Sequence, residues 1–384
     1  MYRRLVIFFH AFLFLVAGFG SAALDAREVR ISASDLLAAF IVDPLEAFGE
    51  ANGLDLEIDS IGSLPAMDRL QSDEIDLAVI AGADAVKFQK RTIDRLAVKE
   101  TLDAKDDRFP EFGATYREIR EYLEFDFDQY VELKNYADSK QIDFMVTAFD
   151  EDAVDFLEKV GVKKFKLASH SLTNLGLLEY LARKKKQTVL STGMAKLDEI
   201  DRAVEIFKSH NAPLALMHCV SAYPTPLAEC NLAMMNTLRN RYGLQVGYSG
   251  HELSYLPSVV AVARGAQLIE RHYTLDKTMV GFDHKMSLEP DELIAMIRDI
   301  RAIRGIVGNG EKKVSETEWV TRRKYHVSMA SIEAIPVGEV LTEDMVTYRN
   351  PGTGIPYKDA SKVLGKRAKM DIAKDVLLDI GMFE

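Results

Sequence analysis

From Gly82 onward, the sequence alternates strand-like apolar runs with amphipathic helical segments. This alternation is typical of βα units around a parallel sheet. Seven runs fit buried strands: Ala85–Gln89, Phe144–Ala148, Phe165–Ser169, Thr188–Thr192, Ala215–Val220, Gln245–Ser249 and Gln267–His272. No GxGxxG motif follows any of these runs, so we disfavour a dinucleotide-binding sheet. We expect an α/β fold built on a (β/α)₈ barrel.

Polar side chains gather where the predicted strands end. They are Lys87 and Gln89, Thr147, Lys166 and Ser169, Ser191 and Thr192, Ser221 and Tyr223, Ser249 and His251, and Glu270 and His272. Because active sites of (β/α)₈ barrels lie at the carboxyl ends of the strands, this placement predicts a catalytic site there.

Composition limits the partners of the chain. Its 384 residues suit two or three domains. Asp and Glu outnumber Lys and Arg by 59 to 48, a net charge of −11, which argues against a nucleic-acid or anionic-membrane partner. A local pocket of Lys and Arg could still bind a small anion. With only two cysteines, Cys219 and Cys230, the chain has no disulfide framework and no Cys-rich zinc site.

The N-terminal residues differ in composition from the rest of the chain. Arg3 and Arg4 precede the apolar run Leu5–Gly18, and small residues follow it. This order is typical of a secretory signal peptide, and the run is shorter than the ~20 residues of a membrane-spanning helix. The alternative is a buried core helix, but such helices rarely begin at residue 5 behind an arginine pair. We therefore favour a signal-like segment over residues 1–26.

The next segment, Val29–Ala81, reads as strand, helix (Leu36–Glu50), strand (Leu54–Ile61), short helix and strand. It resembles the opening of periplasmic substrate-binding proteins of the phosphate type. That resemblance implies that Ser34 and Ser63 hold an oxyanion. We favour the simpler interpretation that both serines cap helices.

Motifs from Gly82 to the C-terminus resemble the N-acetylneuraminate (sialic acid) synthase family. Those of the barrel are GADAVKFQ, FGATYREIREYLEFDFDQY, VTAFDEDAVDFL, KFKLAS, LSTGMAKLDEI, HCVSAYPTP, GYSGHE, ERHYT and FDHKMSLEP. Further on, PVGEVLTEDMV, NPGTGIP and LGKRAKMDI are similar to the antifreeze-like (SAF) domain that follows the barrel in this family. The resemblance covers about four-fifths of the chain, in the family order.

The resemblance implies a transferase that condenses phosphoenolpyruvate with an open-chain N-acylamino sugar of the N-acetylmannosamine type, while water releases phosphate. A divalent metal would polarise the sugar aldehyde. His251 and His272 end successive predicted strands and match the metal ligands of the family. Two imidazoles with oxygen donors suit Mn²⁺, with Mg²⁺ as the alternative.

The anionic substrate needs cations and hydroxyl groups. Lys87 and Lys166 supply ammonium groups at strand ends, where a lysine otherwise needs a buried counter-ion. Positions matching the substrate-binding residues of the family are Lys87, Gln89, Thr147, Lys166, Ser169, Ser191, Ser221 and Ser249. Tyr223 and Asp283 match positions that hold the sugar and orient reacting groups, and Asp283 is the best acid/base candidate. For His170, His218 and His284 we expect packing or hydrogen bonding.

The chain departs from the family at its first strand. Relatives begin with a barrel strand that ends EIG-N-H-G and carries a functional glutamate, and that motif is absent. Seven strands leave two unpaired barrel edges, so another segment must fill the gap. LDLEIDSIG, with Glu57, is the best candidate. Ser171 and Ser221 replace residues frequent near the sugar. Arg349 is displaced by one from the arginine that a partner subunit lends to the sugar's N-acyl group.

The expected organisation is a signal-like segment (1–26), a foreign segment (27–81), the barrel (82–305), a polar linker (306–325) and the SAF domain (326–384). The resemblance implies a homodimer. Phosphoenolpyruvate indicates the cytoplasm, against the signal-like leader. Competing hypotheses are an exported oxyanion-binding protein, an inactive fusion, and a phosphoenolpyruvate aldol condensation that yields 3-deoxy sugar phosphates. We disfavour the last because no extra basic cluster for a sugar phosphate is evident at the strand ends.

Overall fold

The computed structural model describes Phe12–Val16, Val29–Ala33, Leu56–Ser60 and residues 75–384. The chain divides into two compact units, Met1–Val307 and Gly308–Glu384. Ser34, Ser63 and the predicted helix Leu36–Glu50 lie outside the described residues. Within the described ranges, no helix has the length and apolar character needed to cross a bilayer.

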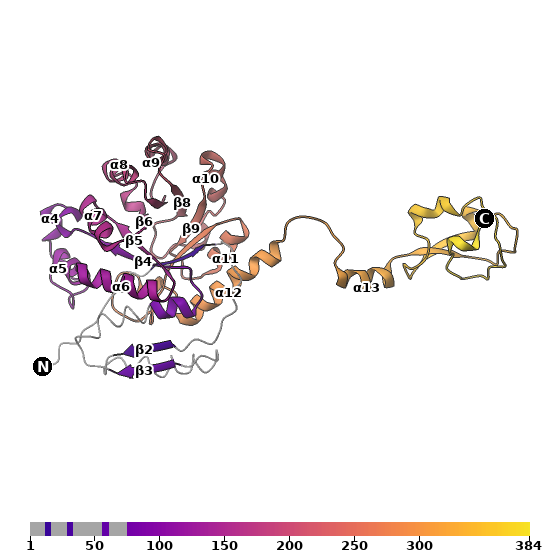
Figure 1. The fold of residues 1–384 in the computed structure, drawn as a ribbon, viewed down its shortest axis with the longest axis horizontal. Helices are drawn as coiled ribbons and strands as arrows, with labels where there is room; N and C mark the ends of the chain where they lie inside the picture. Colours follow the sequence, from indigo (N-terminus) through magenta and orange to yellow (C-terminus); the bar gives the residue numbers. More distant parts are fainter. Residues whose placement is uncertain (1–11, 17–28, 34–55, 61–74) are drawn as a thin grey trace. The chain divides into compact units, whose positions relative to one another are not determined.

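Seven parallel strands form the predicted barrel (Figure 1). They are β4 (Ala85–Lys90), β5 (Asp143–Ala148), β6 (Lys164–Leu167), β7 (Gln187–Ser191), β8 (Leu214–Cys219), β9 (Val246–Gly250) and β10 (Leu268–His272). Each falls on a predicted strand, and the strands pair in chain order from β4 to β10. The expected α/β barrel is confirmed.

The gap between β4 and β10 is closed by β1 (Phe12–Val16), which runs antiparallel to both neighbours. The prediction that LDLEIDSIG fills the gap is wrong, because β3 (Leu56–Ser60) pairs in parallel with β2 (Val29–Ala33) in a separate sheet. The sequence explains the difference. FLFLV is a continuous apolar run, a pattern typical of barrel strands, whereas LEIDS alternates with carboxylates. Although β1 lies inside the predicted leader, the leader itself stays a prediction.

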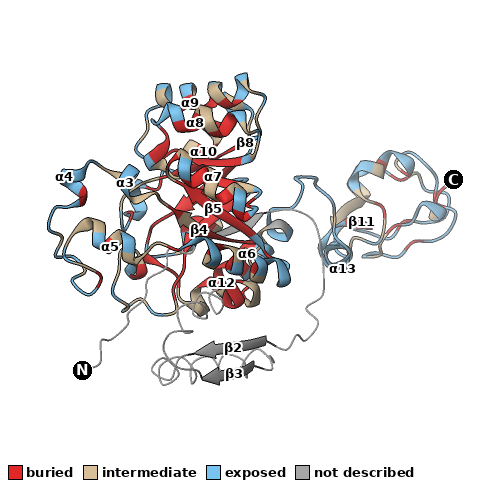
Figure 2. Ribbon diagram, turned by 60° about the vertical axis from the view of Figure 1, so that its left-hand side comes forward, coloured by how far each residue is buried: buried red, intermediate tan, exposed pale blue. Residues whose placement is uncertain are grey.

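Helices cover the outside of the barrel, and the buried residues concentrate on the strands and on the helix faces toward them (Figure 2). The covering helices are α6 (Phe127–Ser139), α7 (Glu151–Val160), α8 (Leu175–Arg183), α9 (Leu197–Ser209), α10 (Met234–Tyr242), α11 (Leu256–Ala263) and α12 (Pro290–Val307). Between β4 and α6, a long segment holds the short helices α3 (Ile93–Leu96), α4 (Lys99–Leu102) and α5 (Tyr116–Tyr122).

The strand predicted just before Ala81 is a helix over residues 75–80. Ile75, Leu77 and Ala78 are buried in the shell of the barrel, and Asp76 accepts a hydrogen bond from Tyr136 of α6 (2.7 Å). A short apolar run of this kind fits a buried helix as well as a strand, so periodicity alone could not separate them. Gly82 ends the helix with φ +82°, a conformation that favours glycine.

Strand alternation separates the barrel interior into an apolar layer and a polar layer. Ala85, Met145, Val189, Ala215, Met217 and Leu268 form a buried cluster near the amino ends of the strands. Two positions further along, the same side of four of these strands is polar, at Lys87, Thr147, Ser191 and Glu270, whereas β8 continues with the apolar Met217. The apolar layer therefore closes one end of the barrel and leaves the polar layer at the carboxyl ends.

The second unit has its own core. β11 (Ser328–Ser331) and β12 (Val346–Arg349) pair antiparallel, and Met329, Ile335, Leu341, Val363 and Phe383 are among the residues buried around them. The predicted polar linker contains a helix, α13 (Glu316–Tyr325), none of whose residues is buried. A buried core within about 75 residues allows this unit to be a domain in its own right.

Candidate active site

A cavity of about 390 Å³ opens at the carboxyl ends of the barrel strands. Its lining includes every site residue predicted in the barrel: Lys87, Gln89, Thr147, Lys166, Ser169, Ser191, Ser221, Tyr223, Ser249, His251, His272 and Asp283. Arg349 lies in the second unit, where its exposed guanidinium pairs with Asp375. The strand-end pattern in the sequence thus identified one common cavity, while the role of each residue stays a proposal.

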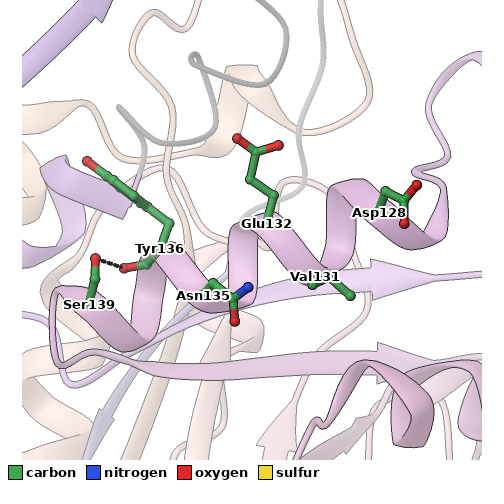
Figure 3. A pocket seen from close by; sticks show the side chains of 6 residues that line it. All are labelled: Asp128, Val131, Glu132, Asn135, Tyr136 and Ser139. Carbon is green, nitrogen blue, oxygen red and sulfur yellow. Dashed lines mark hydrogen bonds between the residues drawn. The ribbon is translucent and has the colours of Figure 1, made fainter.

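A second cavity runs along α6 and has a different character (Figure 3). Its described lining is Asp128, Val131, Glu132, Asn135, Tyr136 and Ser139. Among these described residues are two carboxylates and no cationic side chain, so this part of the lining does not attract an anionic substrate. The strand-end cavity is therefore the candidate site.

Lys87, Lys166 and Glu270 form a buried charge cluster in this cavity. The Nζ atoms of Lys87 and Lys166 lie 3.5 and 3.1 Å from the two carboxylate oxygens of Glu270. Lys87 also donates to Thr147 Oγ1 (3.1 Å) and Lys166 to Ser191 Oγ (2.7 Å). All five side chains are buried, and two ammonium groups share one carboxylate. The cluster carries one unit of positive charge that an anionic ligand would balance.

Burial and neighbouring charges shift the pKa values of this cluster in opposite ways. Burial holds the pKa of Lys87 well below its usual value, although Glu270 opposes the shift. Burial alone would raise the pKa of Glu270, but Lys166 and Lys87 outweigh it and lower that pKa. Glu270 therefore stays ionised, and Lys87 is the cation that gains most from an added anion.

The two predicted metal ligands face the same cavity. The imidazole centroids of His251 and His272 are 5.3 Å apart, close enough for one ion to lie about 2 Å from a nitrogen of each ring. His251 Nδ1 is 3.1 Å from the carbonyl oxygen of Val220, and a proton on Nδ1 leaves Nε2 free to bind a metal. His272 Nδ1 lies 3.7 Å from Asp283 Oδ2. Carbonyl and carboxylate partners of this kind commonly orient metal-binding histidines.

Among the described residues, no group of three or more His, Cys, Asp and Glu is arranged to hold a metal ion. The two imidazoles would therefore need oxygen donors from water or substrate. An ion held in this way keeps open positions, which suits a Lewis acid that must contact its substrate. The residues present fit a divalent metal on these terms.

Tyr223 and Cys219 lie beside the histidine pair. The Tyr223 and His251 rings are 4.3 Å apart, and burial raises the pKa of Tyr223 above its usual value. The phenol stays protonated and can donate a hydrogen bond. Cys219 Sγ is 3.8 Å from His251 Nδ1. Burial opposes ionisation of this thiol, but the His251 contact and Lys166 lower its pKa overall.

The β6 and β7 ends meet closely at Gly193. Its main-chain N–H donates to Ser169 Oγ (2.9 Å), and a Cβ at this position would lie 2.3 Å from Ser221 Oγ. Only glycine leaves both hydroxyl groups their places at the cavity wall. Of the histidines expected to be structural, His218 contacts the carbonyl oxygen of Cys230 (2.8 Å) and His284 contacts Thr274 Oγ1 (2.7 Å), whereas His170 lines the cavity.

Sequence reasoning missed two cations in the cavity wall. Arg91 and Arg120 both line it, which corrects the expectation that no extra basic residues gather at the strand ends. Arg91 directly follows β4 and continues the alternation of Lys87 and Gln89, so it could have been found from that period. Arg120 lies on α5, about 30 residues past β4, and nothing in the sequence spacing brings it to the barrel.

The chain matches the sequence profile of the NeuB family over residues 74–312 and that of the SAF domain over residues 330–384. The first match covers more than half of the chain. This chain belongs to the NeuB family. The resemblance to sialic acid synthases is therefore confirmed, and so is a barrel followed by an SAF domain.

Named relatives fall among the nonulosonic acid synthases. The chain is 36% identical to the N,N′-diacetyllegionaminic acid synthase of Legionella pneumophila, covering 81% of this chain and 89% of the relative. It is 35% identical to the human N-acetylneuraminate-9-phosphate synthase, covering 78% and 84%. A crystal structure of the Leptospira borgpetersenii N-acetylneuraminic acid synthetase with citrate superposes with a TM-score of 0.57 at 30% identity, covering 77% and 90%. NeuB-type synthases are generally metal-dependent.

Proposed function

We propose that this chain condenses phosphoenolpyruvate with an open-chain N-acylamino sugar of the N-acetylmannosamine type, giving a nonulosonic acid and phosphate. The observation that carries the proposal is the cavity that joins the Lys87–Lys166–Glu270 cluster to the His251–His272 pair. The charge cluster suits a small polyanion, and the histidine pair suits a metal ion that polarises a carbonyl group. The names of the relatives leave open whether the sugar is phosphorylated, because only some of them name a phosphate product.

In this proposal the charge cluster binds the phosphate and carboxylate of phosphoenolpyruvate. Lys87 and Lys166 supply the charge, and the hydroxyl groups of Thr147, Ser191 and Ser249 supply neutral donors. Gln89, Ser169 and Ser221 complete the substrate wall. A divalent ion, with Mn²⁺ preferred over Mg²⁺, would be held by His251 and His272 and would polarise the sugar aldehyde.

The remaining groups handle protons and orientation. Tyr223, kept protonated, donates a hydrogen bond to a sugar oxygen. Asp283, 3.7 Å from His272, accepts or returns a proton at the hydroxyl group formed from the aldehyde oxygen. The methylene carbon of phosphoenolpyruvate bonds to the aldehyde carbon, and the aldehyde oxygen takes up a proton to become a hydroxyl group. Water then adds to the neighbouring carbon, which carries the phosphate, and gives up a proton. The bond from that carbon to the phosphate oxygen breaks, which releases phosphate and leaves a ketone.

The test is phosphate release that requires phosphoenolpyruvate, an N-acylamino sugar and a divalent ion, with the product identified by mass spectrometry. His251→Ala and His272→Ala should each abolish tight Mn²⁺ binding, while His210→Ala, on the outside of the barrel, should not. Phosphate release that does not require the sugar would refute the proposal. Unaltered Mn²⁺ affinity in both cavity variants would refute the metal site.

A further inference from the structure

We propose that Arg91 and Arg120 form a clamp for a phosphate group carried by the acceptor sugar, so that the chain uses an N-acylamino sugar phosphate. This inference rests on the proposed function and names its substrate class. Both guanidinium groups line the strand-end cavity, and they come from separate elements, the end of β4 and helix α5.

Neither guanidinium has an acidic partner among the described residues, although both belong to a cavity wall. Arg91 donates to the neutral amide oxygen of Gln89 and stacks on Phe149, with Cζ 4.1 Å from the ring centroid. Arg120 stacks on Phe282 (4.3 Å), and its Nε is buried without a hydrogen-bond partner. Aromatic stacking orients each guanidinium and leaves its N–H groups available for an oxyanion.

The two nearby carboxylates, Asp106 and Glu124, do not neutralise these cations, because each is paired with another cation. Asp106, whose pKa Arg120 helps to lower, accepts hydrogen bonds from the guanidinium group of Arg108. Glu124 accepts from Lys90 Nζ (3.0 Å) and from the main-chain N–H of Arg91 (3.2 Å), so a lysine already balances its charge. Burial lowers the pKa of Arg91 to about 10, and the proximity of Arg120 adds to the shift. Two cations held near one another in a partly buried wall repel each other, and a bound dianion would relieve that repulsion.

Hydrogen bonds and ring contacts hold the segments around Arg91 and Phe282 in place, so the two arginines of the clamp are positioned before a ligand binds. Asp150 caps helix α7 and also accepts from Thr92, through its main-chain N–H (2.8 Å) and its hydroxyl group (2.7 Å). Thr92 directly follows Arg91, so the end of β4 is tied to the end of β5. On the other side, Phe282 packs edge-on against Phe109 (4.5 Å), which joins the segment after β10 to the segment after β4.

The position of Arg91 and Arg120 favours the acceptor sugar, rather than phosphoenolpyruvate, as the ligand that they bind. Arg91 lies four residues beyond Lys87 along the strand direction, a Cα separation on the order of 13 Å. Phosphoenolpyruvate bound on Lys87 and Lys166 lies in the deeper polar layer, and the aldehyde of the acceptor must reach its enol carbon. The far end of the open-chain sugar then extends toward the mouth, where Arg91 and Arg120 would meet a terminal phosphate.

The test measures binding of two unreactive acceptors to the full chain with phosphoenolpyruvate present. The probes are N-acetylmannosaminitol and its 6-phosphate, in which the aldehyde is reduced to an alcohol. We expect the phosphate to improve affinity at least ~30-fold, as two charge-assisted contacts would. Arg120→Met should reduce that difference below about threefold, and Arg120→Lys should retain part of it. Arg117→Met, on the same helix but paired outward with Asp94 and Asp103, should behave as wild type.

Three outcomes would overturn the inference. Equal affinity for the two alditols would show that Arg91 and Arg120 do not bind a phosphate group on the sugar. Weaker phosphoenolpyruvate binding in Arg120→Met, with the alditol preference intact, would assign the clamp to the other substrate. Equal kcat/KM for N-acetylmannosamine and its 6-phosphate would also refute it while leaving the proposed function standing. If the phosphorylated alditol binds as expected and neither sugar is condensed, the proposed function fails and the clamp stands.

Discussion

Lys87 and Lys166 are buried lysines that share the carboxylate of Glu270. Both ammonium groups contact Glu270, and both donate to a hydroxyl group, so these three side chains together carry one surplus positive charge. An unbalanced buried charge of this kind raises the free energy of the ligand-free protein, and binding of an anion lowers that free energy again. The two lysines therefore serve anion binding more than the stability of the fold.

We expect Lys87→Ala and Lys166→Ala each to weaken phosphoenolpyruvate binding by ~2 kcal/mol or more, the scale of a charge-assisted contact. Calorimetry with phosphoenolpyruvate alone measures the effect. Lys164→Ala is the matched control, because Lys164 begins the same strand β6 and pairs with Asp143 outside the cavity. Unchanged affinity in both cavity variants would remove the lysines from the anion site.

Phosphoenolpyruvate binding should also take up protons. Burial holds the pKa of Lys87 low in the empty site, and a bound polyanion raises that pKa toward its usual value. Uptake should grow as the pH rises through the lowered pKa, because the empty lysine is then neutral and the occupied lysine is charged. Calorimetry in buffers of different ionisation enthalpy, repeated over a range of pH, measures this uptake. Proton release, or uptake unchanged in Lys87→Ala, would contradict the assignment.

At the scale of elements, the strand β1 decides whether the barrel is closed. Its backbone pairs with β10 over its whole length and with β4 at its first three residues. A proline at Phe14, opposite both Glu270 and Ala85, removes a ladder hydrogen bond from the barrel interior. We expect Phe14→Pro to lower the free energy of unfolding by more than about 3 kcal/mol.

Chemical unfolding followed by circular dichroism measures this loss. The control is Ile58→Pro in β3, which pairs only with β2 outside the barrel and should cost the barrel less than about 1 kcal/mol. If Phe14→Pro and Ile58→Pro lower the free energy of unfolding equally, β1 is not an essential barrel strand.

The direction of β1 also bears on catalytic rate. Phe12 pairs with His272 and Lys87, and Val16 pairs with Leu268, so β1 ends at the apolar end of the barrel. The carboxyl end of β1 thus lies away from the cavity, whereas the resemblance implies a functional glutamate on a first strand that ends at the cavity. Replacing residues 1–74 with a parallel family strand ending EIG-N-H-G should raise turnover at least ~10²-fold, the lower range for a positioned acid/base group. If phosphate release is no faster after the graft, the native N-terminus is not a defect.

The sequence predicted the seven parallel strands because each is a short apolar run followed by polar residues, a pattern that local chemistry imposes. It did not predict β1, and it predicted β3 as a strand but placed it wrongly in the barrel gap. Which apolar segment fills a barrel gap depends on long-range pairing that no local period encodes. The same limit applies to the site. The strand-end residues from Lys87 to His272 were predictable from alternation, whereas Arg120 reaches the cavity only through the fold of a long connecting segment.

At the scale of the whole molecule, the division at Val307 and Gly308 separates the barrel from a unit that carries Arg349. If the chain forms a homodimer in which this unit completes the partner's site, one defective barrel and one defective Arg349 should complement each other. Co-expressed Lys166→Ala and Arg349→Ala chains would form mixed dimers, each with one intact barrel facing one intact Arg349. Random pairing predicts about one quarter of wild-type activity, since half of the dimers are mixed and each holds one complete site.

The measurement is phosphate release by the co-purified mixture against each variant alone. Arg349→Ala by itself should lose most activity while keeping its phosphoenolpyruvate affinity, because Arg349 is not part of the barrel cavity. Asp375→Ala is the matched control, since it removes the surface partner of Arg349 and leaves the guanidinium in place. Activity of the mixture equal to the sum of its parents would mean that each chain completes its own site. A fully active Arg349→Ala chain would remove the residue from catalysis altogether.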